Sequence, residues 1–391
     1  MIAAFVNDLK IMDDGDGNLY VRGYDRSFWD RYLIYFDKLY VVGRRFKISR
    51  AEIDGMDIFG NEKIELYEVP SIHTITTLLK NSKKIEIVLR ELVCKVDCII
   101  TRQPGTNSNK VIEICRKYKK PYIVEVAGCP LDALWNHSLR GKLLAPYSYL
   151  KTRKNVKEAK YVIYVTDKFL QKRYPTDGKG IGCSDVALSS IQKYVLEKRM
   201  RHISQYKNRN QLHIATVGAV GIKYKGHQYM IRALAKSNKN IIYHIVGSGD
   251  SKNLKELSKK LLVSEQVIFH GSMKHNDIFD FLDDMDLYIQ PSDTEGLPRA
   301  LIEAMSRGLP CFGTAVGGIP ELLDKEFLFS KGRHRVDEII QIIDKFSISI
   351  MKEQAEKNFN KVLKYQETIT GKKRKEIFDE FLDSIPLKQI L

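Results

Sequence analysis

The chain has 391 residues, and its 64 Lys and Arg against 48 Asp and Glu give a formal net charge of +16. That length exceeds one ordinary hydrophobic core and predicts two or three domains. A hydrophobic fraction of 43% is typical of globular domains and excludes general disorder. No apolar run approaches the ~20 residues that span a bilayer, and the six cysteines lack zinc-ligand spacing. We therefore expect a cytoplasmic protein with reduced cysteines and no structural metal.

The positive charge is concentrated in one segment. Residues 1–100 carry 15 basic against 16 acidic side chains, residues 101–210 carry 23 against 8, and residues 211–391 carry 26 against 24. A basic face attracts anionic lipid, nucleic acid or anionic substrates, and it can also be merely solvated. We expect attraction to an anionic membrane surface, with the basic cluster at 116–120 as its contact, and no nucleic acid partner.

Strands and helices alternate along the first half of the chain, which predicts a parallel sheet covered by helices. The expected strands are short apolar runs, at 2–6, 39–42, 64–69, 98–101, 122–126 and 161–165. The expected helices lie between them, at 27–35, 74–93 and 108–118. Glu125 interrupts an apolar strand, so if buried it needs a partner. Arg102 follows another strand and is a candidate contact for an anionic acceptor.

A polar and basic stretch at 188–210 separates this half from a second series of strands and helices. The expected strands of that series lie at 212–217, 241–246, 267–269, 287–289 and 311–313. The tail at 336–384 has the pattern of successive amphipathic helices. Ligands of such α/β domains bind in the loops that follow the carboxyl ends of the strands.

Residues 294–310, TEGLPRALIEAMSRGLP, carry the strongest functional signal. They run from a polar turn into a helix, and free backbone N–H groups at a helix start bind anions. Glu295 lies in the turn, and Glu303 follows two helical turns and ~80° further on. This spacing fits a phosphate flanked by two hydroxyl-bearing rings, as in a nucleoside diphosphate sugar. The alternative is a surface helix on which Glu295 and Glu303 are merely solvated and bind no ligand.

The same region resembles a known enzyme family through five strings: VGAVGIKYKGHQYMIRAL (217–234), IVGSGD (245–250), FHGSM (269–273), EGLPRALIEAM (295–305) and GLPCFGTAVGGIPELL (308–323). In this order they closely resemble the retaining glycosyltransferases of family 4, the group 1 glycosyltransferases, of the bacterial surface-polysaccharide type. The resemblance covers most of residues 211–330 and is weaker over residues 1–190.

The resemblance implies an α/β protein with the GT-B fold, in which two Rossmann-like domains face each other across a cleft. Residues 1–205 would form the acceptor-binding domain and residues 206–371 the nucleotide-sugar-binding domain. The last segment, 372–391, would supply a helix that crosses back to the first domain.

The family also implies roles for two lysines that follow the strand ending at Gly218. Lys225 matches the family's phosphate-binding lysine. Lys223 substitutes for an arginine that the family often places where this chain has Ala219. Fixed cations at these positions would stabilise the pyrophosphate as it leaves.

The remaining donor contacts follow from the same resemblance. Glu295 would contact the transferred sugar, Glu303 the two ribose hydroxyls, and the backbone N–H groups of Gly296 and Leu297 the phosphates. Gly247 would let the backbone approach the donor, and Gly271 would lie near the nucleobase. A third glycine of the dinucleotide fingerprint is missing after Gly247, which argues against NAD.

The acceptor side is less well defined by sequence. Family members often place a histidine directly after the strand at 122–126, and this chain has Ala127 and Gly128 there. Asp132 is the favoured catalytic candidate in its place, with Asn136 and His137 beside it. The glycine-bearing loop at 13–18 is expected to face the acceptor or the donor.

We therefore expect a retaining glycosyltransferase that moves a sugar from a UDP- or GDP-linked donor to a hydroxyl of a glycan or lipid-linked acceptor. No cofactor or metal is expected, because Lys223, Lys225 and a helix N-terminus supply the positive charge. The expected location is cytoplasmic, including the inner face of the plasma membrane. A nucleotide-sugar epimerase or hydrolase on the same fold, and a noncatalytic basic membrane- or nucleic-acid-binding protein, are the alternatives.

Overall fold

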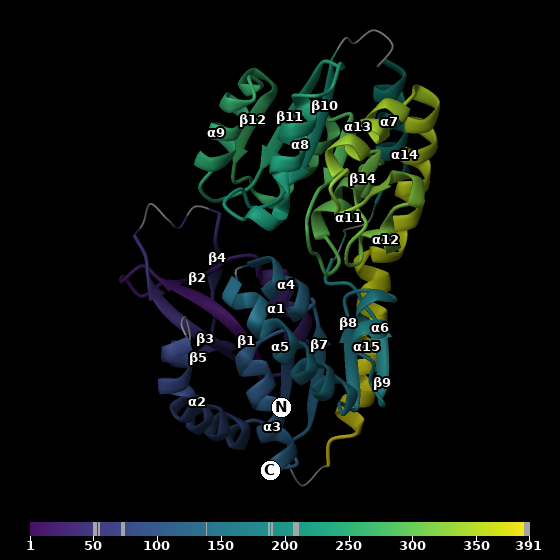
Figure 1. The fold of residues 1–391 in the computed structure, drawn as a ribbon. Helices are drawn as coiled ribbons and strands as arrows, with labels where there is room; N and C mark the ends of the chain where they lie inside the picture. Colours follow the sequence, from purple (N-terminus) through teal and green to yellow (C-terminus); the bar gives the residue numbers. More distant parts are fainter. Residues whose placement is uncertain are drawn as a thin grey trace. The chain divides into compact units, whose positions relative to one another are not determined.

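The computed structural model describes residues 1–49, 53, 55–71, 75–137, 139–186, 188, 191–205 and 211–386, without the side chains of residues 75, 76, 78–80 and 137. The chain separates into two compact units (Figure 1). The first unit comprises residues 1–131, 143–183 and 371–391, and the second comprises residues 132–142 and 184–370. None of the described helices is long and apolar enough to cross a membrane.

The first unit is built on a sheet with the order β4-β2-β1-β6-β7-β8-β9, in which β3 pairs with β1 and β5 pairs with β3. Its strands are β1 (Ile2–Asp13), β2 (Leu19–Val21), β3 (Lys38–Lys47), β4 (Asp57–Phe59), β5 (Ile64–Glu68), β6 (Cys98–Gln103), β7 (Tyr122–Val126), β8 (Tyr161–Tyr164) and β9 (Lys179–Gly182). The pairings of β1 with β3 and with β6 are parallel, as are those from β6 to β9. Its helices are α1 (Arg26–Leu33), α2 (Ile75–Lys95), α3 (Thr106–Lys117), α5 (Leu139–Lys157) and α6 (Phe169–Arg173).

The start of β1 shows that helices cover both faces of this sheet. Residues 3–6, Ala-Ala-Phe-Val, are fully buried, and such continuous burial is typical of a parallel strand between two helix layers. Successive side chains point to opposite faces. Phe5 therefore packs in one core with Trp29 of α1, whereas Val6 belongs to a second core with Leu89 of α2.

The second unit is built on a parallel sheet with the order β12-β11-β10-β13-β14-β15 (Figure 1). Its strands are β10 (Leu212–Val217), β11 (Ile241–Val246), β12 (Val267–Gly271), β13 (Leu287–Gln290), β14 (Cys311–Thr314) and β15 (Leu328–Phe329). Its helices are α4 (Pro130–His137), α7 (Lys193–Gln205), α8 (His227–Leu234), α9 (Lys252–Lys260), α10 (His275–Asp283), α11 (Arg299–Ser306), α12 (Ile319–Leu322), α13 (Arg335–Lys345) and α14 (Ile348–Val362).

The last helix, α15 (Glu367–Asp383), carries the chain from the second unit back to the first. Thr370 is the last of its residues in the second unit, and Gly371 is the first in the first unit. Phe378 and Phe381 are buried in the core of the first unit beside β1 and β6. A helix returning to the first domain was expected within 372–391, and it begins earlier, at Glu367.

Strand β1 and helix α5 are among the elements of the first unit that differ from the sequence predictions. The strand predicted at 2–6 continues to Asp13, because β3 pairs with it from Ile2 to Val6 and, after an irregularity, from Leu9 to Asp13. Residues 14–18 are therefore the tip of a hairpin between β1 and β2. Helix α5 was not predicted, because apolar residues occupy both its buried and its exposed sides and no single apolar stripe stands out.

Candidate active site

The topology of the second sheet creates an opening between β10 and β13. From β10 the chain proceeds through β11 and β12 on one side, and it then returns to β13 on the other side of β10. The loops after β10 and β13 therefore leave the sheet in opposite directions. Such a switch point is where α/β sheets bind ligands. Lys225 lies in the first of these loops and Glu295 in the second.

The switch point brings these two side chains into direct contact. The Lys225 Nζ donates to Glu295 Oε1 at 2.8 Å. The hydroxyl of Ser292 and the amide nitrogen of Gln290 donate to the same oxygen, at 2.7 and 3.1 Å. Burial by itself would lower the pKa of Lys225, but the charge and hydrogen bond of Glu295 outweigh it and raise the pKa above its ordinary value. Lys225 is therefore a fully charged, oriented cation.

Backbone contacts fix the loops around this pair. Gly226 has a left-handed φ of 82°, and a Cβ there would lie 1.9 Å from the carbonyl oxygen of Pro291. Only glycine allows the two loops to approach this closely. The Asp293 N–H also donates to the Tyr224 carbonyl at 2.7 Å. The ammonium and the carboxylate are thus held by backbone as well as by side chains.

A glycine turn after β14 supports the other side of Glu295. Gly317 has φ 59°, and a Cβ there would lie 2.0 Å from the carbonyl oxygen of Glu295. The N–H of Gly318 donates to the carbonyl of Gly296 at 2.7 Å. The turn at Glu295–Gly296 is therefore held between two neighbouring loops.

The helix after this turn begins with free backbone donors. Pro298 is the N-cap of α11, which starts at Arg299. No side chain caps the helix, and in the described part of the chain the N–H groups of Gly296 and Leu297 have no intramolecular acceptor. The positive end of the helix dipole adds to these donors. This is the arrangement of an anion site.

Three predicted glycines form a row at the carboxyl edge of the sheet. The Gly218 N–H donates to the carbonyl of Val246, and the Gly247 N–H donates to that of Gly271, both at 2.8 Å. A Cβ on Gly247 would lie 2.0 Å from the Gly218 carbonyl oxygen, so no larger residue fits there. Gly271 has φ 71° and open space around its Cα. A ligand can approach the backbone closely along this row.

Glu303 lies in the second turn of α11 and is buried. His275, at the start of α10, places its Nδ1 3.8 Å from Glu303 Oε1. Burial raises the pKa of Glu303, while His275 and Arg299 act in the opposite direction. A buried carboxylate without a close internal donor gains most from hydroxyl groups supplied by a ligand.

The other predicted catalytic residues occupy less constrained positions. Lys223 is exposed at the start of a short 3-10 turn (Lys223–Lys225). Asp132 lies in the first turn of α4 and groups with the second unit rather than with the predicted acceptor domain. Asn136 donates to the Asp132 carbonyl at 2.6 Å and accepts from Lys331 at 2.7 Å. The side chain of His137 lies outside the described residues.

Arg102 does not extend toward a ligand as the sequence suggested. Its guanidinium donates to Glu125 Oε2 at 3.0 Å, inside the first unit. Glu125 is 1% exposed and also accepts from Tyr32 and Arg374. The partner that Glu125 was predicted to need is therefore internal.

Sequence reasoning missed the residues that orient the Lys225–Glu295 pair. Gln290 ends β13 and Ser292 follows it, and both are buried polar residues. A glutamine at the end of an otherwise apolar strand was the available signal. His227 was also missed. Its Nε2–H donates to the Gly218 carbonyl at 3.2 Å and so helps to fix the first glycine of the row.

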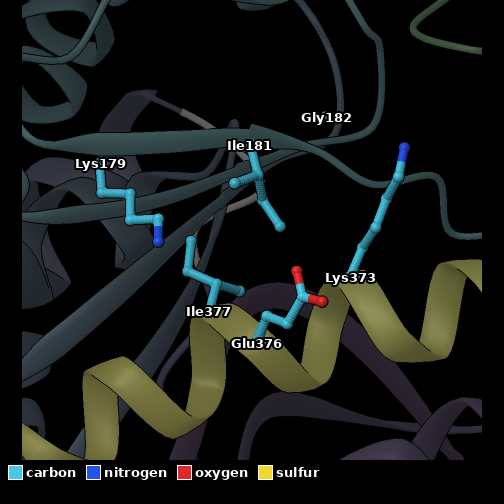
Figure 2. Close-up of a pocket in the computed structure, with 6 residues that line it drawn as sticks. All are labelled: Lys179, Ile181, Gly182, Lys373, Glu376 and Ile377. Atoms are coloured by element: carbon cyan, nitrogen blue, oxygen red, sulfur yellow. The ribbon is translucent and has the colours of Figure 1, made fainter.

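A separate pocket of about 300 Å³ lies in the first unit between β9 and α15. Figure 2 shows its lining residues: Lys179, Ile181, Gly182, Lys373, Glu376 and Ile377. The Lys179 ammonium is paired with Glu380, and none of the predicted site residues lines the pocket. Within the described residues, no cluster of His, Cys, Asp and Glu is suited to hold a metal ion.

Comparison with known proteins finds a family model and a relative that spans nearly the whole chain. The family model "Glycosyl transferases group 1" matches residues 199–362. Protein CapJ of Staphylococcus aureus is 33% identical over 375 residues, covering 94% of this chain and 90% of CapJ.

Two solved structures share the fold. HepE of Anabaena, in complex with UDP-glucose, superposes with a TM-score of 0.64 at 16% identity, covering 97% of this chain and 100% of that one. WaaG, a glycosyltransferase involved in lipopolysaccharide biosynthesis, superposes with a TM-score of 0.62 at 17% identity, covering 96% and 99%. Because the signature strings, the two α/β units and the returning helix all agree with these matches, the chain belongs to the group 1 glycosyltransferases and has the GT-B fold.

Proposed function

We propose that this glycosyltransferase transfers a sugar, with retention of configuration and without a metal ion, from a UDP- or GDP-linked donor. The acceptor would be a hydroxyl of a glycan or lipid-linked glycan in surface-polysaccharide biosynthesis. The observation that carries the proposal is the Lys225–Glu295 pair beside the free N–H groups of Gly296 and Leu297. Two similar structures support the proposal: HepE was solved in complex with UDP-glucose, and WaaG is involved in lipopolysaccharide biosynthesis.

In this proposal the donor phosphates occupy the N-terminus of α11. The N–H groups of Gly296 and Leu297 donate to phosphate oxygens, and Lys225 contributes a full positive charge beside them. Lys223 is exposed, and it approaches the phosphates from solvent. These groups stabilise the negative charge that develops on the leaving diphosphate, which is the role a divalent ion fills in other enzymes.

The two glutamates would hold the rings on either side of the phosphates. Glu303 accepts hydrogen bonds from the ribose hydroxyls, which replace the hydration that its burial removes. Glu295 uses one oxygen for Lys225, Ser292 and Gln290. Its other oxygen remains for a hydroxyl of the transferred sugar. The nucleobase would lie near Gly271.

The proposed chemistry needs no enzyme nucleophile. The acceptor hydroxyl attacks the anomeric carbon from the face on which the phosphate departs. The anomeric C–O bond to phosphate breaks as the new glycosidic bond forms, and the hydroxyl proton passes to the leaving phosphate oxygen. Asp132 is proposed to orient the acceptor or sugar from α4.

Mass spectrometry of the purified chain with a panel of nucleotide sugars and glycan acceptors tests this proposal. We expect a glycosylated acceptor and free nucleoside diphosphate, formed together. Free nucleotide without acceptor would instead indicate a hydrolase, and an isomerised donor an epimerase. No turnover with any donor, together with no nucleotide binding, would favour a noncatalytic role.

A lipid-linked acceptor would place the enzyme at the inner face of the plasma membrane. The charge of residues 101–210, 23 basic against 8 acidic, supports attraction to an anionic surface there. The location is accordingly proposed as cytoplasmic and peripheral, held to the surface without a spanning segment.

A further inference from the structure

Arg335 is a buried cation at the start of α13, and only 2% of it is exposed. A guanidinium is rarely buried unless it is paired. Its own helix does not favour it, because a cation at a helix N-terminus meets the positive end of the dipole. The reason for its position therefore lies in its contacts outside α13.

The guanidinium contacts three other elements of the second unit. Its Nη1 donates to Asp293 Oδ1 at 2.7 Å, in the loop after β13. Its Nε donates to the Ser330 carbonyl, directly after β15, at 3.3 Å. Its Cζ lies 3.9 Å from the centroid of the Tyr229 ring on α8, well within the range of a cation–π contact. One planar side chain thus fixes a carboxylate, a carbonyl and an aromatic ring.

Asp293 connects this guanidinium to both members of the ion pair in the candidate active site. The Asp293 N–H donates to the carbonyl of Tyr224, the residue before Lys225, at 2.7 Å. Ser292, the residue before Asp293, donates to Glu295 Oε1 at 2.7 Å. A shift of Asp293 would therefore move the carbonyl next to the lysine and the hydroxyl that orients the glutamate.

Tyr229 extends the same support to the loop that carries the lysine. That loop ends at Gly226, and the Tyr229 N–H donates to the Gly226 carbonyl at 2.9 Å in the first turn of α8. Stacking on the Tyr229 ring therefore anchors the helix start that follows Lys225. Arg335 holds the lysine loop through α8 and the glutamate loop through Asp293.

We infer that Arg335 is a positioning residue for sugar transfer, which locks the loops after β10 and β13 so that Lys225 and Glu295 meet as a preformed pair. This inference rests on the proposed function, in which Lys225 faces the leaving diphosphate. It adds a residue that acts through other side chains rather than on the donor itself. Such preorganisation is sensitive, since a displacement of ~1 Å can cost ~10²-fold in rate.

A purely structural role is the competing explanation, and Arg199 provides the comparison. Arg199 is also 2% exposed and also belongs to the second unit. It donates to three backbone carbonyls, those of Leu282, Met285 and Arg307. None of these carbonyls belongs to the loops after β10 and β13. Loss of either guanidinium should lower stability, but only loss of Arg335 should disturb the ion pair.

Steady-state kinetics of the full chain tests the inference in two backgrounds. Arg335→Met removes the charge and the planar fork, and it should lower kcat ~10–10²-fold. In a Lys225→Ala background the same substitution should have little further effect, because residues that act through one another are not additive. Arg335→Lys keeps the charge without the fork, so its kcat should be intermediate. Arg199→Met is the matched control and should keep the wild-type kcat.

Calorimetry with UDP and GDP should find nearly wild-type affinity in Arg335→Met. The N–H groups at the start of α11 remain in place there, because the Gly318 N–H holds the carbonyl of Gly296 independently of Arg335. The expected result is thus a loss of kcat without a matching loss of nucleotide binding. Thermal melts establish that each variant is folded.

Competitive acylation of lysines reports on the ion pair without any turnover. Acylation consumes the neutral amine, and the contact with Glu295 keeps the Lys225 amine charged. Arg335→Met should therefore speed the labelling of Lys225 relative to the exposed Lys252 in the same sample, measured by peptide mass spectrometry. Arg199→Met should leave that ratio unchanged. If Arg335→Met does not fold, Arg335→Lys carries both measurements.

These measurements separate the inference from the proposed function. Wild type without sugar transfer, combined with faster Lys225 labelling in Arg335→Met, would remove the proposed function and leave Arg335 as the residue that sets the pair. The inference is wrong if the Arg335 variants keep the wild-type kcat and labelling ratio, or if Arg199→Met is equally impaired. It is also wrong if the loss of kcat persists in full without Lys225, because Arg335 would then act through the charge of Asp293.

Discussion

Arg374, on the helix that returns to the first unit, donates from Nη1 to Glu125 Oε1 at 2.7 Å, across 249 residues of sequence. Both residues are buried, at 5% and 1% exposure. Arg102 and the Tyr32 hydroxyl donate to the same carboxylate. One acidic group at the carboxyl end of β7 thus joins α1, β6 and α15. The returning helix is held by charge as well as by its aromatic residues.

Glu125→Gln should destabilise the protein by ~3–5 kcal/mol, because it leaves the buried Arg374 and the partly buried Arg102 without their counter-charge. Denaturant unfolding at neutral pH measures the change. Lys375→Ala, which breaks an exposed ion pair with Asp379 on the same helix, is the control and should cost little. A Glu125→Gln variant as stable as the control would show that the cluster does not hold the helix.

Glu303→Gln should weaken binding of the free nucleoside diphosphate by ~1.5–3 kcal/mol, because the charge-assisted bonds to ribose are lost. Isothermal calorimetry with UDP and GDP measures the effect. Glu256→Gln, at an exposed position of α9, should bind like wild type. Equal affinity of the Glu303 variant and wild type would remove Glu303 from the donor site.

Lys225→Ala should lower kcat by ~10²–10³-fold, because it removes a preorganised cation from the leaving phosphate. Lys223→Ala should have a smaller effect, since that side chain is exposed and not held in place. Initial rates with saturating donor separate the two variants, and Lys252→Ala on α9 is the control for loss of a surface charge. A larger effect at Lys223 than at Lys225 would reverse the assigned roles.

Chelation should leave the transfer rate unchanged. Lys225, Lys223 and the N–H groups at the start of α11 supply the positive charge that the leaving diphosphate requires. Initial rates in excess EDTA, with and without added magnesium or manganese, provide the measurement. Loss of turnover in EDTA that either ion restores would show that a divalent cation takes part.

Five of the six strands of the second sheet could be predicted closely, because each is a short, mostly apolar run between polar turns; the two-residue β15 was not predicted. β10 and β11 have the predicted bounds, and β12, β13 and β14 differ only at their ends. The contact between Lys225 and Glu295 could not be predicted from spacing, because it joins residues 70 apart in sequence. It depends on β10 and β13 being neighbours, which is a property of strand order and not of either loop.

The same limit explains why Gln290 and Ser292 were overlooked. Gln290 lies one residue beyond the predicted strand and Ser292 in the loop that follows it, but their role arises only when a lysine from another loop meets the same carboxylate. In the first unit, β2, β4 and β9 were missed because strands this short carry little pattern. Helix α5 was missed because its exposed leucines hide the periodicity on which helix prediction depends.

His227 should make the protein less stable in acid. Its ring is 1% exposed, and burial lowers the pKa to about 4, below the ordinary value of 6.5. The unfolded chain therefore binds a proton at His227 before the folded chain does. The contribution of this histidine to stability is complete above pH 6.5 and is lost as the pH falls toward about 4.

Denaturant unfolding across that interval measures the loss, which is at most ~1.4 kcal/mol per pH unit for one histidine. His227→Gln should reduce the slope of the unfolding free energy against pH by the contribution of one proton. Glutamine does not titrate, but it can still donate to the Gly218 carbonyl. His334→Gln, at an exposed position, should retain the wild-type slope. An unchanged slope in His227→Gln would mean that the acid sensitivity arises elsewhere, for example at His244, whose pKa burial also lowers to about 4.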